Sequence, residues 1–445
     1  MSRFAVNNLP IEMFALWLLE FALCYYLAYV LLSPSIGQTS VEAITTTHAF
    51  LLALAVAATA FLIGLYRPAV FARTRSMLVN TALGGLLAFP AAWLAARFIG
   101  LKPDQLVGFD TLWPLKIVSI WIAALFVTRL TFLIAIRSNL FVRRVAMVGG
   151  AGEMVATVAA VRSGQKGFIE IVSGPTDTAD PATLRGAGVL DVILSNSAGQ
   201  KLTDADRRGF AAKGISLETE AAFWEHHLKR VDVATIGPDW VAGLDRAPLS
   251  RFQRAVNRGG DIVISLGLLI FTLPLMGLVA LLVRGDSPGS VLYKQERVGL
   301  GGRSFTLLKF RSMRANAENS GPAWASMGDP RVTRVGAFIR RTRMDELPQL
   351  FNVLRGEMSF IGPRPERPHF VQQLANVIPF YSERARVKPG LTGWAQVNFP
   401  YGASVEDARV KLSYDLFYVK HRSVLLDMAI LFATVRVILF QEGSR

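Results

Sequence analysis

The sequence has few residues of the kinds that form disulfides, thiolate nucleophiles or soft metal sites. Cys24 is the single cysteine among 445 residues and lies inside a long apolar stretch, so disulfides, thiolate catalysis and cysteine-based metal sites are excluded. The five histidines show no ligand spacing, and we interpret them as surface or core residues: His48, His226, His227, His369 and His421. No Ser/His/Asp arrangement stands out either.

The chain is too apolar for an ordinary soluble protein, with 52% hydrophobic residues and a mean hydropathy of +0.37. Four apolar stretches approach the roughly 20 residues that a bilayer-spanning helix needs: 11–32, 49–66, 78–96 and 112–136. Basic residues follow the second and fourth stretches, whereas 33–48 has none, so the positive-inside rule predicts cytoplasmic termini. The first stretch is predicted to be a retained anchor, because it is too long for a cleaved signal peptide.

A second pattern begins after Arg144, where short apolar runs alternate with Gly, Asp and Pro. Strands are predicted at 145–148 and 189–194, with a glycine turn at 149–152 and a helix at 153–161, which is typical of a doubly wound α/β domain. The dinucleotide fingerprint is incomplete, because Val155 replaces its third glycine and the acidic candidates Glu170 and Asp177 are loosely placed. A regulatory or dimerising domain is the favoured interpretation, with dinucleotide binding as the alternative.

A fifth apolar stretch, 262–283, has basic residues on both sides. Pro274 lies near its centre, where a proline removes a helix hydrogen bond and favours a bend. We therefore predict a re-entrant helix that enters the membrane, breaks and returns to the cytoplasmic face. A plain fifth span is the alternative.

Positive charge is concentrated after this point. From Arg251 onward, 27 Lys and Arg stand against 15 Asp and Glu, which accounts for +12 of the formal net charge of +15. The basic residues form no recognition helix, heptad-linked basic region or aromatic-studded RNA sheet, so nucleic acid is not a predicted partner. Lipid head groups and phosphorylated substrates fit this charge better.

The run 342–366 places an acidic pair, Asp345 and Glu346, directly before a predicted helix. Pro348 suits the first turn, Gly356 ends the helix, and four apolar side chains fall on one face: Leu347, Leu350, Phe351 and Leu354. A helix N-terminus carries unpaired N–H groups and a partial positive charge, so it holds phosphates, or carboxylates that bind a metal and attack a phosphate. Simple N-capping is the alternative.

Two further strands are predicted at 291–297 and 305–311, joined as a hairpin by the glycine-rich segment 299–303. The second strand carries Lys309 and Arg311 at alternate positions and therefore on one face. They are candidates for phosphate contacts, with plain surface charge as the alternative.

The chain then shows three ordered motifs that resemble the bacterial sugar transferase family of polyprenyl-phosphate hexose-1-phosphate transferases: LLKFRSM at 307–313, DELPQLFNVLRGEMSFIGPRPE at 345–366 and VKPGLTGWAQVN at 387–398. The similarity spans 251–440. The apolar stretches and the central α/β segment resemble the larger members, which start exopolysaccharide, capsule or O-antigen repeat units. VNFPYGASVEDA resembles an exopolysaccharide-associated branch, although Phe399 stands where other relatives commonly have glycine.

This resemblance implies transfer of hexose-1-phosphate from a UDP-hexose to undecaprenyl phosphate, with release of UMP, on the cytoplasmic face of the bacterial inner membrane. Asp345 matches the family's nucleophile, which forms a covalent phosphosugar intermediate, and Glu346 matches its Mg²⁺ ligand. Magnesium takes one or two carboxylates plus substrate phosphate oxygens, so the pair suffices. Further residues are expected to bind substrate: Lys309, Arg311, the phosphate-contacting match Arg340, the uridine-side loop Pro363, Arg364 and Pro365, and the weaker candidates Asp415 and Tyr418.

The expected architecture is a membrane protein in three segments: a four-helix transmembrane domain at 1–140, a doubly wound α/β domain at 141–245, and a monotopic α/β catalytic domain with its re-entrant helix at 251–445. Residues 1–250 are expected to be dispensable for chemistry. A homodimer and contacts with polysaccharide-assembly proteins are further expectations.

Two other functions compete with this interpretation. A membrane-anchored nucleotide-sugar dehydratase should carry a Tyr-x-x-x-Lys pair and a full second glycine fingerprint, and the sequence has neither. A non-enzymatic scaffold for polysaccharide machinery would not need the dense acidic and basic motifs. Release of UMP in the presence of undecaprenyl phosphate distinguishes all three.

Overall fold

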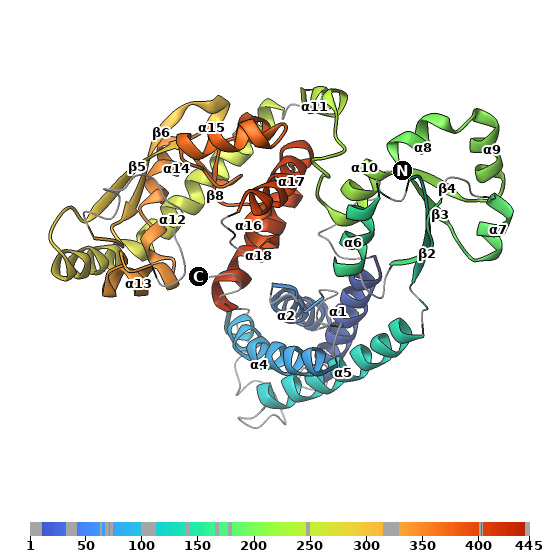
Figure 1. Cartoon of the computed structure of the whole chain (residues 1–445). Helices are drawn as coiled ribbons and strands as arrows, with labels where there is room; N and C mark the ends of the chain where they lie inside the picture. Colours follow the sequence, from blue (N-terminus) through green and yellow to red (C-terminus); the bar gives the residue numbers. More distant parts are fainter. Residues whose placement is uncertain are drawn as a thin grey trace. The chain divides into compact units, whose positions relative to one another are not determined.

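The computed structural model divides the chain into two compact units, Met1–Phe223 and Trp224–Arg445. Figure 1 colours the first from blue to green and the second from green to red. The structure describes residues 11–32, 42–62, 65–66, 71, 74–98, 113–138, 140, 142–150, 152, 154–164, 169–176, 180–245, 250–314, 329–399, 402 and 404–440.

Four long helices open the first unit: α1 (Ile11–Leu32), α2 (Glu42–Leu62), α4 (Thr74–Phe98) and α5 (Trp113–Arg137). By length and composition α1 and α5 contain stretches able to cross a membrane, as does α12 of the second unit, while α2 contains a shorter apolar helix, Thr46–Phe61. The chain therefore has the apolar helices of a membrane protein, and the count of four spans stays a prediction. Arg67 and Arg73, two of the basic residues that follow the second apolar stretch, lie outside the described residues.

A buried ion pair joins the first and last of these helices. Glu20 of α1 and Arg129 of α5 are both fully buried, with 3.2 Å between Arg129 Nη2 and Glu20 Oε2. Tyr66 donates a further hydrogen bond to Glu20 at 2.6 Å, and Thr128 donates one at 2.9 Å. Charges inside apolar helices are costly unless they are paired, so this network explains how two otherwise apolar helices tolerate them.

The rest of the first unit is an α/β domain with four parallel strands in the order β2-β1-β3-β4. This confirms the predicted parallel pattern. Its elements are β1 (Arg143–Val148), α6 (Val155–Gly164), β2 (Ile169–Thr176), α7 (Pro181–Gly186), β3 (Asp191–Leu194), α8 (Asn196–Lys201), α9 (Asp204–Ala212), β4 (Ser216–Thr219) and α10 (Glu220–Phe223).

The glycine turn after β1 has a packing explanation. Gly149 has φ +146°, and a Cβ atom there would collide with Ser195 at the end of β3. Glu170, one of the two acidic candidates, pairs with Arg144 at 3.1 Å, whereas Asp177 lies outside the described residues. The turn thus serves the contact between two strands, and the role of this domain stays a prediction.

The second unit begins before the predicted boundary at 245. It contains η3 (Trp224–Leu228), α11 (Pro238–Asp245), α12 (Arg251–Asp286), β5 (Leu292–Val298), η4 (Leu300–Gly302), β6 (Ser304–Phe310), α13 (Arg334–Arg341), η5 (Met344–Glu346), α14 (Gln349–Arg355), β7 (Ser359–Ile361), α15 (Pro368–Val377), η6 (Tyr381–Arg386), β8 (Gly390–Thr392), α16 (Trp394–Asn398), α17 (Val405–His421) and α18 (Val424–Phe440). Val231, Val233 and Ile236 are buried in the same core as Trp394 and Leu416. The segment 224–245 therefore packs with the second unit.

Two short sheets position the loops of this unit. Strands β5 and β6 form the predicted antiparallel hairpin, with Tyr293 opposite Lys309. Strands β7 and β8 are parallel and join the two motifs around residues 360 and 390. Strand β6 carries Lys309, which contacts the acidic pair. Strand β7 leads into the Pro363–Pro365 loop.

Helix α14 ends as predicted at Gly356, whose φ of +81° suits glycine. The predicted apolar face is wrong in part, because Phe351 is exposed whereas Asn352 and Val353 are fully buried. The reason is a polar contact: Asn352 accepts from Leu308 N at 3.0 Å and donates to Thr306 O at 2.7 Å. The helix therefore turns its amide side chain toward the backbone of β6.

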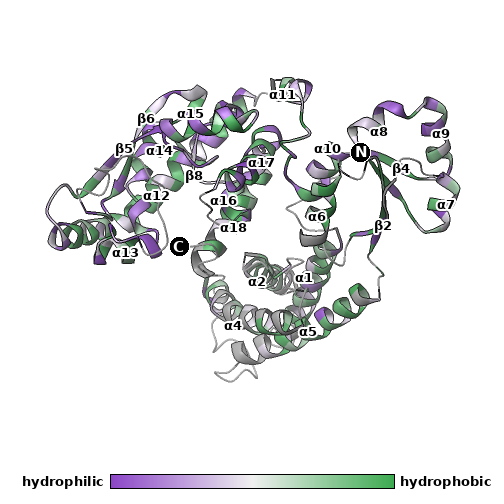
Figure 2. Ribbon diagram, in the orientation of Figure 1, coloured by the Kyte–Doolittle hydropathy of each residue, from purple (hydrophilic) through white to green (hydrophobic). Residues whose placement is uncertain are grey.

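Helix α12 is 36 residues long and continues through Pro274 without a loop. Any return to the same membrane face would thus require a bend within α12 instead of the predicted break. Its middle is coloured green, as apolar, in Figure 2. Several of its apolar side chains are between 70% and 82% exposed: Val263, Ile270, Phe271 and Leu281. Such a surface on a single helix is typical of contact with lipid.

Candidate active site around Asp345 and Glu346

The acidic pair lies in a 3-10 turn, η5, between α13 and α14. Arg343 begins this turn with φ +60°, an uncommon left-handed conformation for a non-glycine residue, and thereby turns the chain sharply after α13. Asp345 is 8% exposed, and the Glu346 side chain is 12% exposed. Both carboxylates are thus largely removed from water, where their charges need partners.

Three cations from three parts of the chain surround Glu346. Arg364 Nη2 donates to Glu346 Oε1 at 2.7 Å, Lys309 Nζ lies 3.6 Å from that oxygen, and Arg343 Nη1 lies 3.7 Å from it. All three contacts fall on Oε1. Within the part of the chain that the structure describes, no hydrogen bond to the Asp345 carboxylate is recorded. The two neighbouring carboxylates therefore have different surroundings.

The pKa values of the pair follow this difference. Burial, and then the negative charge of Glu346, raise the pKa of Asp345 above its ordinary value. Burial would also raise the pKa of Glu346, but Arg364, Lys309 and Arg343 outweigh it and hold that pKa well below its ordinary value. Glu346 is accordingly a fixed anion, while Asp345 is a carboxylate made more basic by its setting.

Lys309 reaches the pair through the contact between α14 and the hairpin. Asn352, six residues after Glu346 on α14, bonds to the backbone of β6 on both sides of Leu307. Lys309, the residue after Leu308 on β6, lies close to Glu346 as a result. Burial lowers the pKa of Lys309, as expected for an ammonium group largely removed from water.

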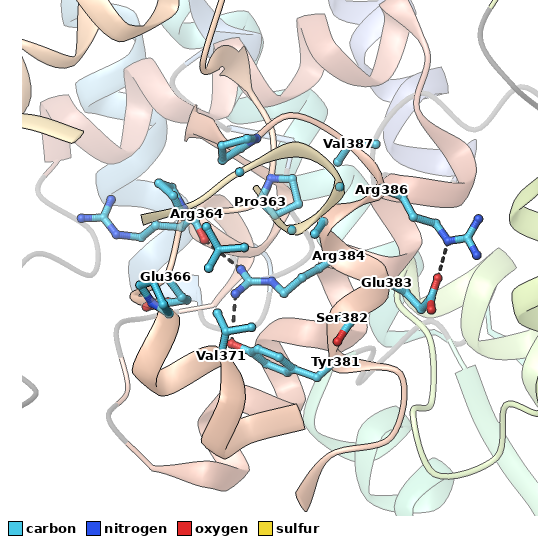
Figure 3. A pocket seen from close by; sticks show the side chains of 18 of the residues that line it. Pro363, Arg364, Glu366, Val371, Tyr381, Ser382, Glu383, Arg384, Arg386 and Val387 are labelled. Carbon is cyan, nitrogen blue, oxygen red and sulfur yellow. Dashed lines mark hydrogen bonds and ion pairs between the residues drawn. The ribbon is translucent and has the colours of Figure 1, made fainter. Parts of the chain in front are cut away.

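A cavity of about 580 Å³ lies beside the Pro363–Pro365 loop. Its lining includes Gly301, Pro363, Arg364, Val371, Tyr381 and Arg384. Figure 3 shows Arg384 reaching into the middle of this group, toward the backbone at Arg364, while the Arg364 side chain extends away from it. The backbone of Arg364 thus lies at the cavity, and its guanidinium extends to Glu346.

Other predicted site residues have different contacts. Arg311 donates to the carbonyl oxygens of Val283, at 3.2 Å, and Ser287, at 2.6 Å, and so caps the end of α12. Arg340 lies on α13, and none of its described contacts reaches the acidic pair. Asp415 pairs with Arg384 at 2.7 Å, and Tyr418 donates to Asp427 at 2.9 Å. Substrate contacts for these four residues stay predictions.

Three residues that shape the site were not predicted from the sequence: Arg343, Asn352 and Arg384. Arg343 is two residues before Asp345, and Arg384 is three residues before the motif at 387–398, so proximity to a motif was an available signal. Asn352 gave a weaker signal, as a polar residue inside an apolar helical pattern.

The similarity to known proteins lies within the second unit of the chain. A family model described as bacterial sugar transferase matches residues 252–441. A protein of Rhizobium leguminosarum bv. phaseoli named exopolysaccharide production protein PSS is 42% identical over 189 residues, which cover 40% of this chain and 93% of that protein. The chain belongs to the bacterial sugar transferase family.

Individual relatives carry related names. A UDP-N-acetylgalactosamine-undecaprenyl-phosphate N-acetylgalactosaminephosphotransferase of Aeromonas hydrophila is 45% identical over 216 residues, 48% of this chain and 50% of that protein. A putative undecaprenyl-phosphate N-acetylgalactosaminyl 1-phosphate transferase of Bacillus subtilis is 55% identical over 130 residues, 29% of this chain and 73% of that protein. The match thus spans half the length of the Aeromonas relative.

Proposed function

We propose that this protein transfers hexose-1-phosphate from a UDP-sugar to undecaprenyl phosphate and releases UMP. The observation that carries the proposal is the pair of unlike carboxylates, Asp345 and Glu346, buried beside three cations. Phosphoryl transfer needs a nucleophile and fixed positive charge around the phosphate oxygens, and this arrangement supplies both. The names of the relatives support the same reaction class.

In this proposal the chemistry proceeds in two steps at Asp345. The carboxylate attacks the phosphorus that bears the hexose, a bond to Asp345 forms, and the bond to UMP breaks. The phosphate of undecaprenyl phosphate then attacks the same phosphorus and frees Asp345. A covalent intermediate lets one site handle two anionic substrates in turn, and the raised pKa of Asp345 favours it as a nucleophile.

The basic residues divide the remaining work. Lys309 and Arg343 supply positive charge beside the reacting phosphate, and Arg364 links that charge to the cavity. A cavity of about 580 Å³ falls within the usual range for small-molecule sites and accommodates the nucleotide part of a UDP-sugar. Arg340 is the further candidate for a phosphate contact, from the resemblance described above.

The donor set fits Mg²⁺. Among the described residues there is no group of three His, Cys, Asp or Glu side chains able to cage a metal, but Mg²⁺ commonly uses one or two carboxylates with substrate phosphate oxygens. Glu346, with Asp345 beside it, would hold the ion. When bound, the ion would neutralise charge on the phosphate groups.

We further propose that α12 is re-entrant and that the site faces the cytoplasm at the bacterial inner membrane. Both ends of α12 contact helices next to the acidic pair: Arg258 donates to Val353 O of α14 at 2.6 Å, and Asp286 accepts from Val335 N of α13 at 3.2 Å. This placement would bring the acidic pair to a lipid phosphate that stays at the interface. A homodimer and contacts with polysaccharide-assembly proteins stay predictions.

The test is replacement of the nucleophile. Asp345→Asn keeps the size of the side chain and removes its nucleophilic charge, so UMP release from UDP-glucose, UDP-galactose or UDP-N-acetylgalactosamine with undecaprenyl phosphate should fall to background. No sugar-phosphate adduct should appear by mass spectrometry. Asp239→Asn, at an exposed position of α11, is the matched control and should keep full activity. Substantial activity in Asp345→Asn would indicate direct transfer, with Asp345 as a metal ligand only.

A further inference from the structure

The loop from Pro363 to Glu366 is held by each of its four carbonyl oxygens. Pro363 O accepts from Gly390 N at 2.9 Å, and Glu366 O accepts from Val298 N at 2.9 Å. The two middle carbonyls accept from arginine side chains: Arg364 O from Arg384 at 3.0 Å, and Pro365 O from Arg297 at 2.8 Å. A segment with two prolines has few backbone donors of its own, so its position depends on these outside groups.

Arg384 is itself held firmly. Its side chain is 12% exposed, and both Nε and Nη2 donate to Asp415 Oδ2, at 3.1 Å and 2.7 Å. Its third nitrogen, Nη1, donates to Tyr381 Oη at 3.0 Å. All three nitrogens of the planar guanidinium thus donate hydrogen bonds, to Asp415, Tyr381 and the Arg364 carbonyl. A lysine could not satisfy three such partners from one point charge.

These contacts form a chain that ends at the acidic pair. Asp415 on α17 orients Arg384 on η6, Arg384 fixes the backbone of Arg364, and the Arg364 guanidinium reaches Glu346 at 2.7 Å. Among the neighbouring charges that lower the pKa of Glu346, that of Arg364 has the largest effect. A shift in its backbone would move that charge away from Glu346.

We propose that Arg384, oriented by Asp415, is a positioning residue for Arg364. This inference rests on the proposed phosphosugar transfer. It also gives Asp415 a different part from the substrate contact expected from the sequence: Asp415 acts on the reaction through two arginines. Tyr381 supports the same guanidinium from the other side.

The reaction is sensitive to such positioning because groups around a transferring phosphate act only at the right distance. A displacement of about 1 Å at a reacting centre can cost about 100-fold in rate. Arg384→Lys keeps a positive charge opposite Asp415 but loses the geometry that reaches the Arg364 carbonyl. We therefore expect kcat/KM for UMP release to fall about 10- to 100-fold in this variant.

The decisive experiment is a double-mutant cycle in the full-length protein. Arg384→Lys, Arg364→Ala and the double variant are compared by UMP release, with the UDP-sugar that the unaltered protein uses best. If Arg384 acts through Arg364, Arg384→Lys should cost little further activity once Arg364 is alanine. Additive losses would overturn the proposal, because Arg384 would then act by another route.

Control variants separate positioning from loss of the fold. Arg409→Lys makes the same replacement on α17, at an arginine paired with Glu406, and should leave activity and the melting temperature unchanged. If Arg384→Lys does not fold, Tyr381→Phe removes one hydrogen bond to the guanidinium and keeps the ring. Tyr381→Phe should lower activity by itself and cause no further loss in an Arg364→Ala background. Unchanged activity in Tyr381→Phe, or a loss that adds to that of Arg364→Ala, would contradict the proposal. Absence of UMP release from the unaltered protein would instead refute the proposed function.

Discussion

At the scale of single residues, the main feature is the inequality of two adjacent carboxylates. Glu346 receives Arg364, Lys309 and Arg343 on one oxygen, whereas burial and the neighbouring negative charge raise the pKa of Asp345. Adjacent acids of the same strength would compete for protons and for cations. Here the Glu346 carboxylate is paired with the cations, and the Asp345 carboxylate is available to react.

Lys309 allows this electrostatic arrangement to be tested by pH. Its charge lowers the pKa of Asp345, so Lys309→Met should raise that pKa further. Because a nucleophilic carboxylate must be ionised, the acidic limb of the pH profile of kcat/KM should move to higher pH. At pH 7 the activity should also fall, by roughly 100-fold, from loss of a fixed charge near the phosphate.

Lys294→Met removes a lysine from β5, the other strand of the same hairpin, at an exposed position and serves as the control. Its pH profile should match that of the unaltered protein. A limb that stays in place or moves to lower pH in Lys309→Met would show that Lys309 does not act on Asp345.

At the scale of elements, α12 is tied to the second unit at both of its ends. Near its start Arg258 donates to Val353 O and Leu354 O, and Asp261 accepts from Phe360 N at 2.7 Å. Near its end Arg311 donates to Ser287 O. A straight helix of 36 residues would be about 54 Å long, longer than a bilayer core is thick. Because both ends contact the same unit, the re-entrant arrangement is favoured over a full span.

Cysteine labelling tests this arrangement. Ala255→Cys and Gly285→Cys, each in a Cys24→Ala background, place a thiol near either end of α12, and Gly285 has open space where a side chain would stand. An impermeant maleimide should label both positions from the cytoplasmic side of inverted vesicles, and neither from the outside of intact cells. Labelling from opposite faces would establish a full span and refute the re-entrant proposal.

At the scale of the whole molecule, the segment 224–245 decides where an independent catalytic unit begins. Glu225 is buried and accepts hydrogen bonds from Trp240 at 2.6 Å and Lys420 at 2.7 Å, with His421 at 2.7 Å on its other oxygen. Burial would raise the pKa of Glu225, but these partners hold it at about 2. The segment therefore belongs to the packed core that supports α17.

Two truncated chains test this division. A chain that begins at Trp224 should fold in detergent or nanodiscs and release UMP. A chain that begins at Ser250 loses Val231, Val233 and Ile236, and each fully buried side chain of this kind contributes about 1.5–3 kcal/mol. We therefore expect the shorter chain to melt at a much lower temperature or not to fold.

We therefore expect residues 1–223 to be dispensable for the reaction, and not the whole of 1–250. An inactive but folded chain from Trp224 would mean that the first unit completes the active site. A chain from Ser250 as stable as the longer one would show that segment 224–245 contributes little to the core.

Much of the protein followed from the sequence alone. Apolar stretches predicted the long helices, alternation and glycines predicted the β5–β6 hairpin, and Pro348 and Gly356 delimited α14. The motifs identified Asp345, Glu346, Lys309 and Arg364, which the structure brings together. These features depend on residues close in the chain, or on motifs whose order is preserved, so local chemistry was enough to predict them.

Tertiary structure decided which long side chains reach the acidic pair. Arg343 faces Glu346, Arg311 instead caps α12, and Asn352 turns into β6 against the apolar pattern of its helix. Arg384 and Arg364 are 20 positions apart, and Lys420 and Glu225 are 195 apart. A guanidinium or ammonium group can extend toward several neighbours, so its partner depends on how distant segments pack, and periodicity along the chain carries no information about that choice.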